Sequence, residues 1–102
     1  MNIQGILTLM GFAQKAGKLA AGESAVENFL KKGRVRLLVL SEELSEQRRD
    51  FWQKQAQLYE ITAITIPVTK VEIGLAVGQS PRGIIGMMDS KMAEAVMKKL
   101  ED

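Results

Sequence analysis

The sequence contains neither cysteine nor histidine. Without cysteine there is no disulfide and no thiolate nucleophile. Without histidine there is no imidazole base, no Ser-His-Asp triad and none of the usual zinc sites. Most common catalytic routes are therefore closed, and we expect a protein that is not an enzyme and that uses neither a metal nor a cofactor.

Long apolar runs are also absent, as are basic residues near the amino terminus. No lysine or arginine precedes Lys15, and no apolar segment is long enough to cross a bilayer. We therefore expect no secretory signal, no contact with a membrane and a cytoplasmic location. No linker or repeat divides the 102 residues, of which 46% are hydrophobic, so residues 1–102 are expected to form one domain.

The net charge is small but unevenly distributed. A formal charge of +2 and an isoelectric point of about 9.0 permit a nucleic-acid partner without demanding one. Residues 1–41 carry six basic and two acidic side chains, whereas residues 42–102 carry eight basic and ten acidic ones. The first part of the chain is therefore expected to supply a basic patch. Its basic residues are Lys15, Lys18, Lys31, Lys32, Arg34 and Arg36.

Apolar spacing predicts five helices in alternation with four strands. The helices are expected to begin at capping residues, namely Asn2, Ser24 (in a capping box with Glu27), Ser45, Thr69 (with Glu72) and Asp89. Short apolar or β-branched runs predict strands over 19–21, 35–40, 61–66 and 83–88. This α/β alternation with short connections predicts a three-layer α/β/α sandwich with a four-stranded mixed sheet.

Several local patterns have ordinary structural interpretations. The glycines between 74 and 86 form neither a dinucleotide fingerprint nor a Walker sequence, and the segment around Ser80 lacks a nucleophile elbow. The carboxylates between 42 and 50 are interpreted as solvated or helix-terminal groups. Trp52 and Tyr59 share a helical face, which indicates packing rather than base stacking.

The start of the second helix combines free backbone amides with basic neighbours. A helix terminus that follows a glycine suits contacts to phosphates or base edges, and the basic residues between 18 and 36 would supply the field. Glu23 and Glu27 oppose simple phosphate binding. A basic stretch beside a helix is also commonly just a solvated face. RNA binding and a solvated surface are therefore both open interpretations of this segment.

Two longer stretches carry a family resemblance, KAGKLAAGESAVENFLKKGRVRLLVLSEE and TKVEIGLAVGQSPRGIIGMMD. Their combination resembles the L7Ae/L30e family of ribosomal proteins, and most closely its small bacterial members of the YlxQ type, across almost the whole chain. The resemblance implies a non-catalytic protein that binds structured RNA such as kink-turns. Ribosomal RNA, the ribosome and translation or transcription factors are the partners it suggests, and we expect a monomer.

In this family three loops at one edge of the fold contact the RNA, and the resemblance assigns residues to each loop by position. The implied RNA-binding residues are Lys18, Gly22, Glu23, Ser24, Ala25 and Asn28 at the first loop, Glu42 and Glu43 at the second, and Gln79, Ser80, Pro81 and Arg82 at the third. Gln79 and Pro81 stand where apolar side chains commonly pack against an extruded base.

The first loop departs from the family pattern Gly-x-Asn-Glu-x-x-Lys. Only Gly22 is retained, because Ser24, Ala25 and Asn28 occupy the other three positions. These departures argue against high-affinity kink-turn binding, while the resemblance still implies binding of some RNA by shape, splayed bases and backbone.

The leading hypothesis is an accessory, ribosome-associated RNA-binding protein in which Lys18, Arg36 and Arg82 provide the electrostatic attraction. The alternative is a protein-interaction adaptor that keeps the fold but has lost the RNA surface. Strong salt dependence of binding would favour the first, and salt-insensitive binding to a protein would favour the second. An enzyme acting on a nucleotide is supported only by analogy of fold.

Overall fold

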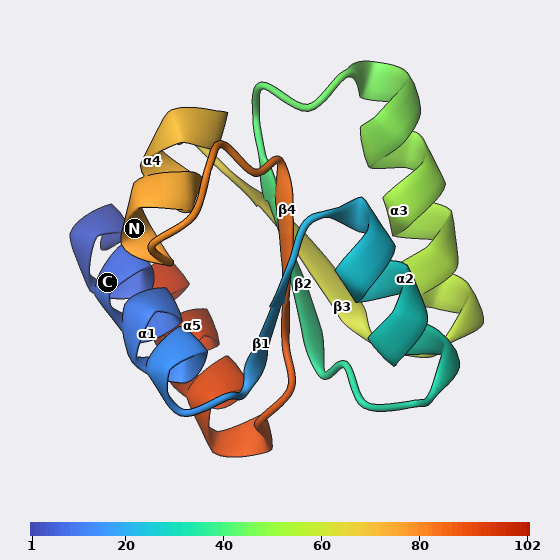
Figure 1. Cartoon of the computed structure of the whole chain (residues 1–102), viewed down its shortest axis with the longest axis horizontal. Helices are drawn as coiled ribbons and strands as arrows, with labels where there is room; N and C mark the ends of the chain where they lie inside the picture. The colour runs from blue at the N-terminus through green and yellow to red at the C-terminus, as the bar shows by residue number, and fades with distance from the viewer.

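Helices and strands alternate in the order that the sequence predicts. The computed structural model describes residues 1–102 (Figure 1). Its elements are α1 (Ile3–Lys15), β1 (Leu19–Ala21), α2 (Glu23–Lys31), β2 (Leu37–Ser41), α3 (Glu46–Leu58), β3 (Thr62–Ile66), α4 (Lys70–Ala76), β4 (Ile84–Met87) and α5 (Ser90–Glu101). The predicted α/β class is therefore confirmed.

The four strands form one mixed sheet in the order β1-β4-β2-β3. The last strand in the sequence, β4, lies between β1 and β2 and is antiparallel to both, whereas β2 and β3 are parallel. Met87 of β4 is the register partner of Leu19 on one side and of Leu37 on the other. The three strands β1, β2 and β3 therefore all point the same way.

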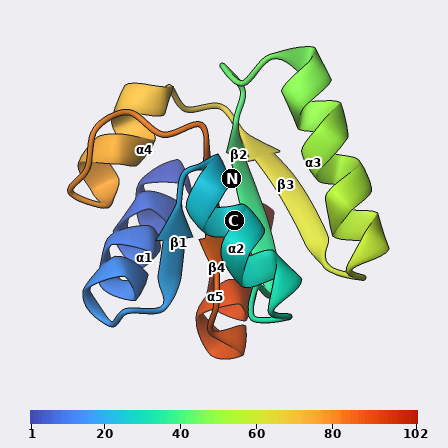
Figure 2. The ribbon, with the colours of Figure 1, turned by 45° about the vertical axis from the view of Figure 1, so that its right-hand side comes forward.

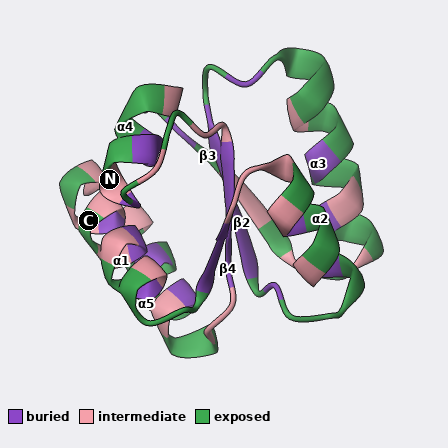
Figure 3. Ribbon diagram, viewed as in Figure 1, coloured by how far each residue is buried: buried purple, intermediate pink, exposed green.

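Helices cover both faces of the sheet (Figure 2). Leu37 and Val39 of β2 pack in the core beneath α1, α4 and α5, and Leu38 and Leu40 pack in the core beneath α2 and α3. Figure 3 shows the buried strands β2 and β4 between the two helical layers. A continuous apolar run is what a strand with two covered faces requires, and the expected three-layer sandwich is confirmed.

Four of the five helices begin at the side chains that the sequence predicts. Asn2, Ser45 and Asp89 each accept a hydrogen bond from a backbone amide in the first turn of α1, α3 and α5. Thr69 and Glu72 form the predicted capping box of α4. These caps satisfy amides that have no partner inside a helix.

The predicted capping box of α2 at Ser24 is wrong. The helix begins earlier, at Glu23, and its N-cap is Gly22, which has no side chain to accept a hydrogen bond. Gly22 has φ of 91° and ψ of 159°, a conformation that favours glycine. It lets the chain turn from β1 into the helix within one residue, which leaves Ser24 inside the first turn.

Strand direction gathers particular loops at each end of the sheet. The carboxyl ends of β1, β2 and β3 and the amino end of β4 lie at one end. We call this end the loop edge; it holds residues 22–25, 42–44, 67–70 and 79–82. The opposite end holds residues 16–18 and 31–36, and we call it the basic edge. Both ends are visible in Figure 1.

A close backbone approach seats the third loop on α4. The amide of Gln79 donates to the carbonyl of Gly74 at 2.8 Å. A Cβ added to Gly74 would lie 2.5 Å from the carbonyl oxygen of Ser80, which is too close for any side chain. Glycine at position 74 therefore fixes how closely the third loop approaches α4.

Replacing Gly74 with alanine is expected to destabilise the protein, because the loop or the helix must shift to admit the methyl group. Overpacking of this kind typically costs about 1–3 kcal/mol in the free energy of unfolding, measurable by urea denaturation. The control is Leu75→Ala on the same helix, where the side chain is 74% exposed and a change of less than about 0.5 kcal/mol is expected. Equal midpoints for the two variants would contradict this account.

Candidate nucleic-acid interface

Backbone hydrogen bonds hold the first, second and third loops together at the loop edge. The amide of Gly22 donates to the carbonyl of Ile84 at 2.9 Å, and the amide of Ser41 donates to the carbonyl of Gly83 at 2.9 Å. Both acceptors belong to the start of β4 and the residue before it. Because one short segment contacts both neighbours, the three loops occupy fixed positions relative to one another.

The second loop is tied to the start of α4 through Ser41, the buried polar residue of the core. Its hydroxyl donates to the carbonyl of Val68 at 2.7 Å and accepts from the amide of Glu43 at 3.0 Å. The Glu43 carboxylate then accepts from the amide of Lys70 at 2.8 Å. Glu43 therefore has a structural partner, whereas the exposed Glu42 has no hydrogen bond or ion pair from its side chain.

Arg82 joins the third loop to the first. Its Nη1 donates to the hydroxyl of Ser80 at 2.5 Å and to the carbonyls of Ser80 and Pro81 at 3.2 and 3.1 Å. A Cβ added to Gly22 would lie 3.3 Å from both Cδ and Nε of Arg82. The guanidinium group thus lies against the start of α2, and it takes part in none of the ion pairs of the protein.

The amino terminus of α2 differs from those of the other helices because no side chain caps it. Its first helical hydrogen bond runs from the amide of Val26 to the carbonyl of Gly22. The preceding amides, on Glu23, Ser24 and Ala25, receive no side-chain acceptor. Amides at such a terminus, together with the positive end of the helix dipole, favour an anion. With Arg82 beside them, they form a group at the loop edge that attracts anions.

Glu23 has a structural role that the sequence does not reveal. Its Oε1 accepts hydrogen bonds from Trp52 Nε1 at 2.6 Å and from Nε and Nη2 of Arg48 at 2.9 and 2.7 Å. Burial acts to raise the pKa of Glu23, but the hydrogen bonds from Trp52 and Arg48, with the charges of Arg48 and Lys70, outweigh it and hold the pKa below 4.5. The carboxylate that seemed to oppose phosphate binding is therefore turned toward α3 and neutralised.

The structure brings together only part of the set of residues assigned from the sequence. Residues 22–25, 42–43 and 79–82 meet at the loop edge. Asn28 lies exposed further along α2. Lys18 precedes β1 and Arg36 precedes β2, so both lie at the basic edge, at the other end of the sheet.

Lys70 is a residue of the loop edge that the sequence reasoning missed. Its carbonyl accepts from the amide of Arg82 at 3.0 Å, and its Cε lies 3.5 Å from a Cβ added to Gly83. The sequence did contain a signal for the position of Lys70, because this residue comes shortly after the third predicted strand. Parallel strands end at the same edge of a sheet, so the residues after β2 and β3 are neighbours.

Two further observations concern the chain as a whole. No group of three or more acidic, histidine or cysteine side chains is placed to hold a metal ion. None of the helices combines the length and the apolar content needed to span a bilayer. The loop edge offers backbone amides, exposed turns and the cations Arg82 and Lys70, which together suit a phosphate-bearing ligand of irregular shape.

Comparisons with known proteins are consistent with the family resemblance. No family model matches the chain. A curated relative, the RNA-binding protein YlxQ of Enterococcus faecium, is 24% identical over 100 residues, covering 98% of this chain and 95% of the relative. The resemblance to YlxQ-type proteins is thereby confirmed.

Solved structures match the fold closely. A protein of unknown function from Bacillus halodurans superposes with a TM-score of 0.86 at 24% identity, covering 95% of this chain and 97% of that one. The 15.5 kD RNA-binding protein of Giardia lamblia has a TM-score of 0.77 at 12% identity, covering 96% and 83% of the two chains. These matches establish a shared fold.

Removing the Glu23 side chain is expected to destabilise the protein. The Glu23→Ala change leaves the buried indole N–H of Trp52 without its acceptor, which typically costs about 1–3 kcal/mol in the free energy of unfolding. Glu23→Gln keeps an oxygen acceptor and loses only the charge, so a smaller loss of below about 1 kcal/mol is expected. Thermal or urea unfolding measures both, and equal losses would argue against the indole contact as the main contribution.

The lowered pKa of Glu23 also predicts that the stability of the protein depends on pH. Because the pKa of Glu23 is lower in the folded protein than in the unfolded chain, its ionisation stabilises the fold fully above pH 4.5 and progressively less as the pH falls through the folded value. The stability difference between the parent protein and Glu23→Gln should therefore shrink on acidification from pH 7 to pH 3. A constant difference over that range would show that the charge of Glu23 has no part in stability.

Proposed function

We propose that this protein binds structured RNA at its loop edge and catalyses no reaction. The observation that carries the proposal is the uncapped amino terminus of α2 with Arg82 lying against it, at an edge where three loops are locked together. The names of the YlxQ relative and of the Giardia protein support RNA as the ligand. An anion-binding terminus on a rigid surface suits the backbone of a folded RNA.

The three loops divide the recognition between them. Amides of residues 23–25 hold a phosphate, and Arg82 adds charge beside it. The exposed Pro81 and the half-buried Gln79 of the third loop offer a surface for an unstacked base. Glu42 accepts a hydrogen bond from a base or ribose, since its side chain has no partner within the protein. Together these contacts recognise the shape of an internal loop of the RNA rather than its base sequence.

The RNA is a kink-turn or a related internal loop, and ribosomal RNA is the natural source of such a structure. The first loop lacks the Asn, Glu and Lys of the family pattern, and the third loop presents Gln79 and Pro81 instead of apolar side chains. These changes replace side chains of the family pattern, whereas the backbone amides at the start of α2 remain. The preference for a kink-turn over other RNA is therefore expected to be modest.

Replacing Ser24 with aspartate tests this surface without unfolding it. Ser24 is exposed in the first turn of α2, where a carboxylate favours the helix dipole by about 0.3–1 kcal/mol. The same carboxylate repels a phosphate at the helix terminus. We therefore expect a protein that is slightly more stable but binds a kink-turn RNA about tenfold more weakly, a change equivalent to about 1.4 kcal/mol.

The measurement is a titration against a kink-turn RNA and a plain duplex of equal length, each at two salt concentrations. Arg82→Ala should weaken kink-turn binding as Ser24→Asp does. The matched control is Thr8→Glu, which makes the same charge change on an exposed residue in the middle of α1, in the other helical layer. If Thr8→Glu weakens binding as much as Ser24→Asp, the loop edge is not the binding surface, and salt-insensitive association with a protein would favour an adaptor instead.

A further inference from the structure

The basic edge carries a cluster of cations that the loop edge does not use. The segment from Lys31 to Arg36 reads KKGRVR and contains four basic residues and no acidic one. It connects α2 to β2 at the end of the sheet opposite the loop edge (Figure 1). Four of the six basic residues in the first 41 residues therefore lie on one short connection.

The fold holds this connection in a defined shape. Gly33 has φ of 70°, and its amide donates to the carbonyl of Leu30 at 3.0 Å. The amide of Arg34 donates to the carbonyl of Phe29 at 3.0 Å. Together these bonds close the carboxyl end of α2 in a tight turn with a basic side chain on each side of the glycine.

Phe29 orders two of the cations. The Nζ of Lys32 lies 5.5 Å from the centre of the Phe29 ring, and the guanidinium carbon of Arg34 lies 5.7 Å from it. Cations at this distance over an aromatic face are attracted to it. Neither side chain pairs with a carboxylate, and both are exposed. Their charges are thus held in place and left free for a ligand.

Backbone bonds to the end of β4 bring one more cation, Lys18, to the same edge as Arg36. The amide of Arg36 donates to the carbonyl of Met87 at 2.7 Å, and the amide of Met88 donates to the carbonyl of Lys18 at 2.8 Å. Lys18 and Arg36 therefore flank the end of β4, one on each neighbouring strand. Both are exposed and unpaired.

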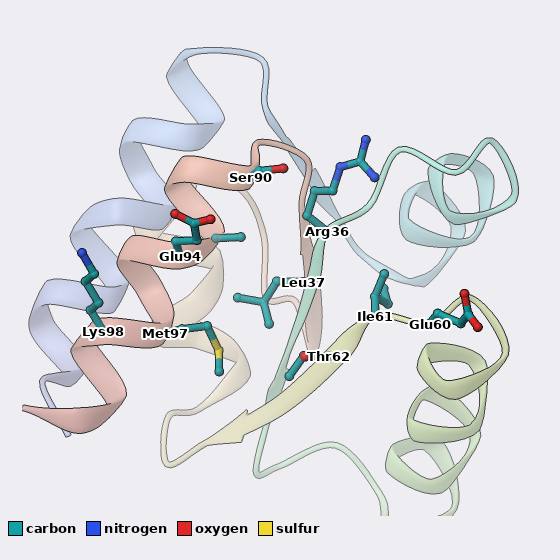
Figure 4. Close-up of a pocket in the computed structure, with 10 residues that line it drawn as sticks. Arg36, Leu37, Glu60, Ile61, Thr62, Ser90, Glu94, Met97 and Lys98 are labelled. Atoms are coloured by element: carbon teal, nitrogen blue, oxygen red, sulfur yellow. The ribbon is translucent and has the colours of Figure 1, made fainter.

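No acidic residue forms an ion pair with the four cations Lys18, Lys32, Arg34 and Arg36. Glu27 forms an ion pair with Lys31 at 2.9 Å and raises the pKa of that lysine. Glu60 and Glu94 line a cavity of about 580 Å³ with Arg36, but neither forms an ion pair with it. Figure 4 shows the Arg36 guanidinium extending away from Leu37 and Thr62, on the side of Ser90. Its charge is therefore available outside the cavity.

We infer that the basic edge is a second RNA-binding surface, at which Lys18, Lys32, Arg34 and Arg36 contact the phosphate backbone of an RNA segment distinct from the one at the loop edge. Backbone phosphates are recognised by such unpaired lysines and arginines, without dependence on base sequence. Insertion into a membrane interface would also use exposed apolar side chains among the cations. The exposed large hydrophobic residues all lie outside residues 16–18 and 31–36.

The test is binding of a plain RNA duplex by the full chain carrying Lys32→Gln and Arg34→Gln together. Both side chains are exposed, so the fold should be retained, as circular dichroism can verify. Loss of two phosphate contacts should weaken duplex binding about tenfold and reduce the slope of log K against log salt by about 2. The matched control is Arg49→Gln with Lys54→Gln, an arginine and a lysine on α3 that form no ion pair, which should change affinity less than about twofold.

Ser24→Asp separates this inference from the proposed function. It should weaken kink-turn binding and leave duplex binding unchanged, because the duplex contacts the basic edge. If Ser24→Asp has no effect on either RNA while the Lys32 and Arg34 changes weaken duplex binding, the loop-edge proposal fails and the basic-edge inference stands. The inference would be overturned if the control double variant weakened duplex binding as much as Lys32→Gln with Arg34→Gln does. Tighter binding of the protein to vesicles of anionic lipid than to the duplex would overturn it as well.

Discussion

The insertion of β4 between β1 and β2 is the constraint on which the other features of this protein depend. The carbonyls at its start accept from Gly22 and Ser41, which begin or precede two of the loops, while its end bonds to the segments that hold Lys18 and Arg36. A strand that is antiparallel to both neighbours must bring its own first loop to the edge where theirs end. One short strand therefore organises both ends of the molecule.

Much of the fold follows from local patterns in the sequence. Helical periodicity, the capping side chains at Asn2, Ser45, Thr69 and Asp89, and the apolar run of β2 are local signals, and the structure confirms the elements they predict. The N-cap of α2 was predicted wrongly, because Ser24 and Glu27 have the spacing of a capping box. The decisive property was the backbone conformation of Gly22, which is set by the strand before it.

The site was harder to predict because it depends on contacts between distant segments. The partners of Glu23 lie 25 and 29 residues away, so its neutralisation by Arg48 and Trp52 has no signature in the neighbouring sequence. Lys18 lies only four positions before Gly22, yet β1 extends between them and carries them to opposite ends of the sheet. Their closeness in the sequence suggested one basic patch, but β1 places Lys18 and Gly22 on two separate surfaces.

The position of β4 also has a consequence for synthesis of the chain. β1 is complete within the first 21 residues, but β4 is its neighbour in the sheet and begins only at Ile84. Until the segment 84–87 has left the ribosomal exit tunnel, β1 has no strand to pair with and the turn at Gly22 lacks its acceptor. The native sheet, and with it the loop edge, can therefore form only after the last strand has entered the gap between β1 and β2.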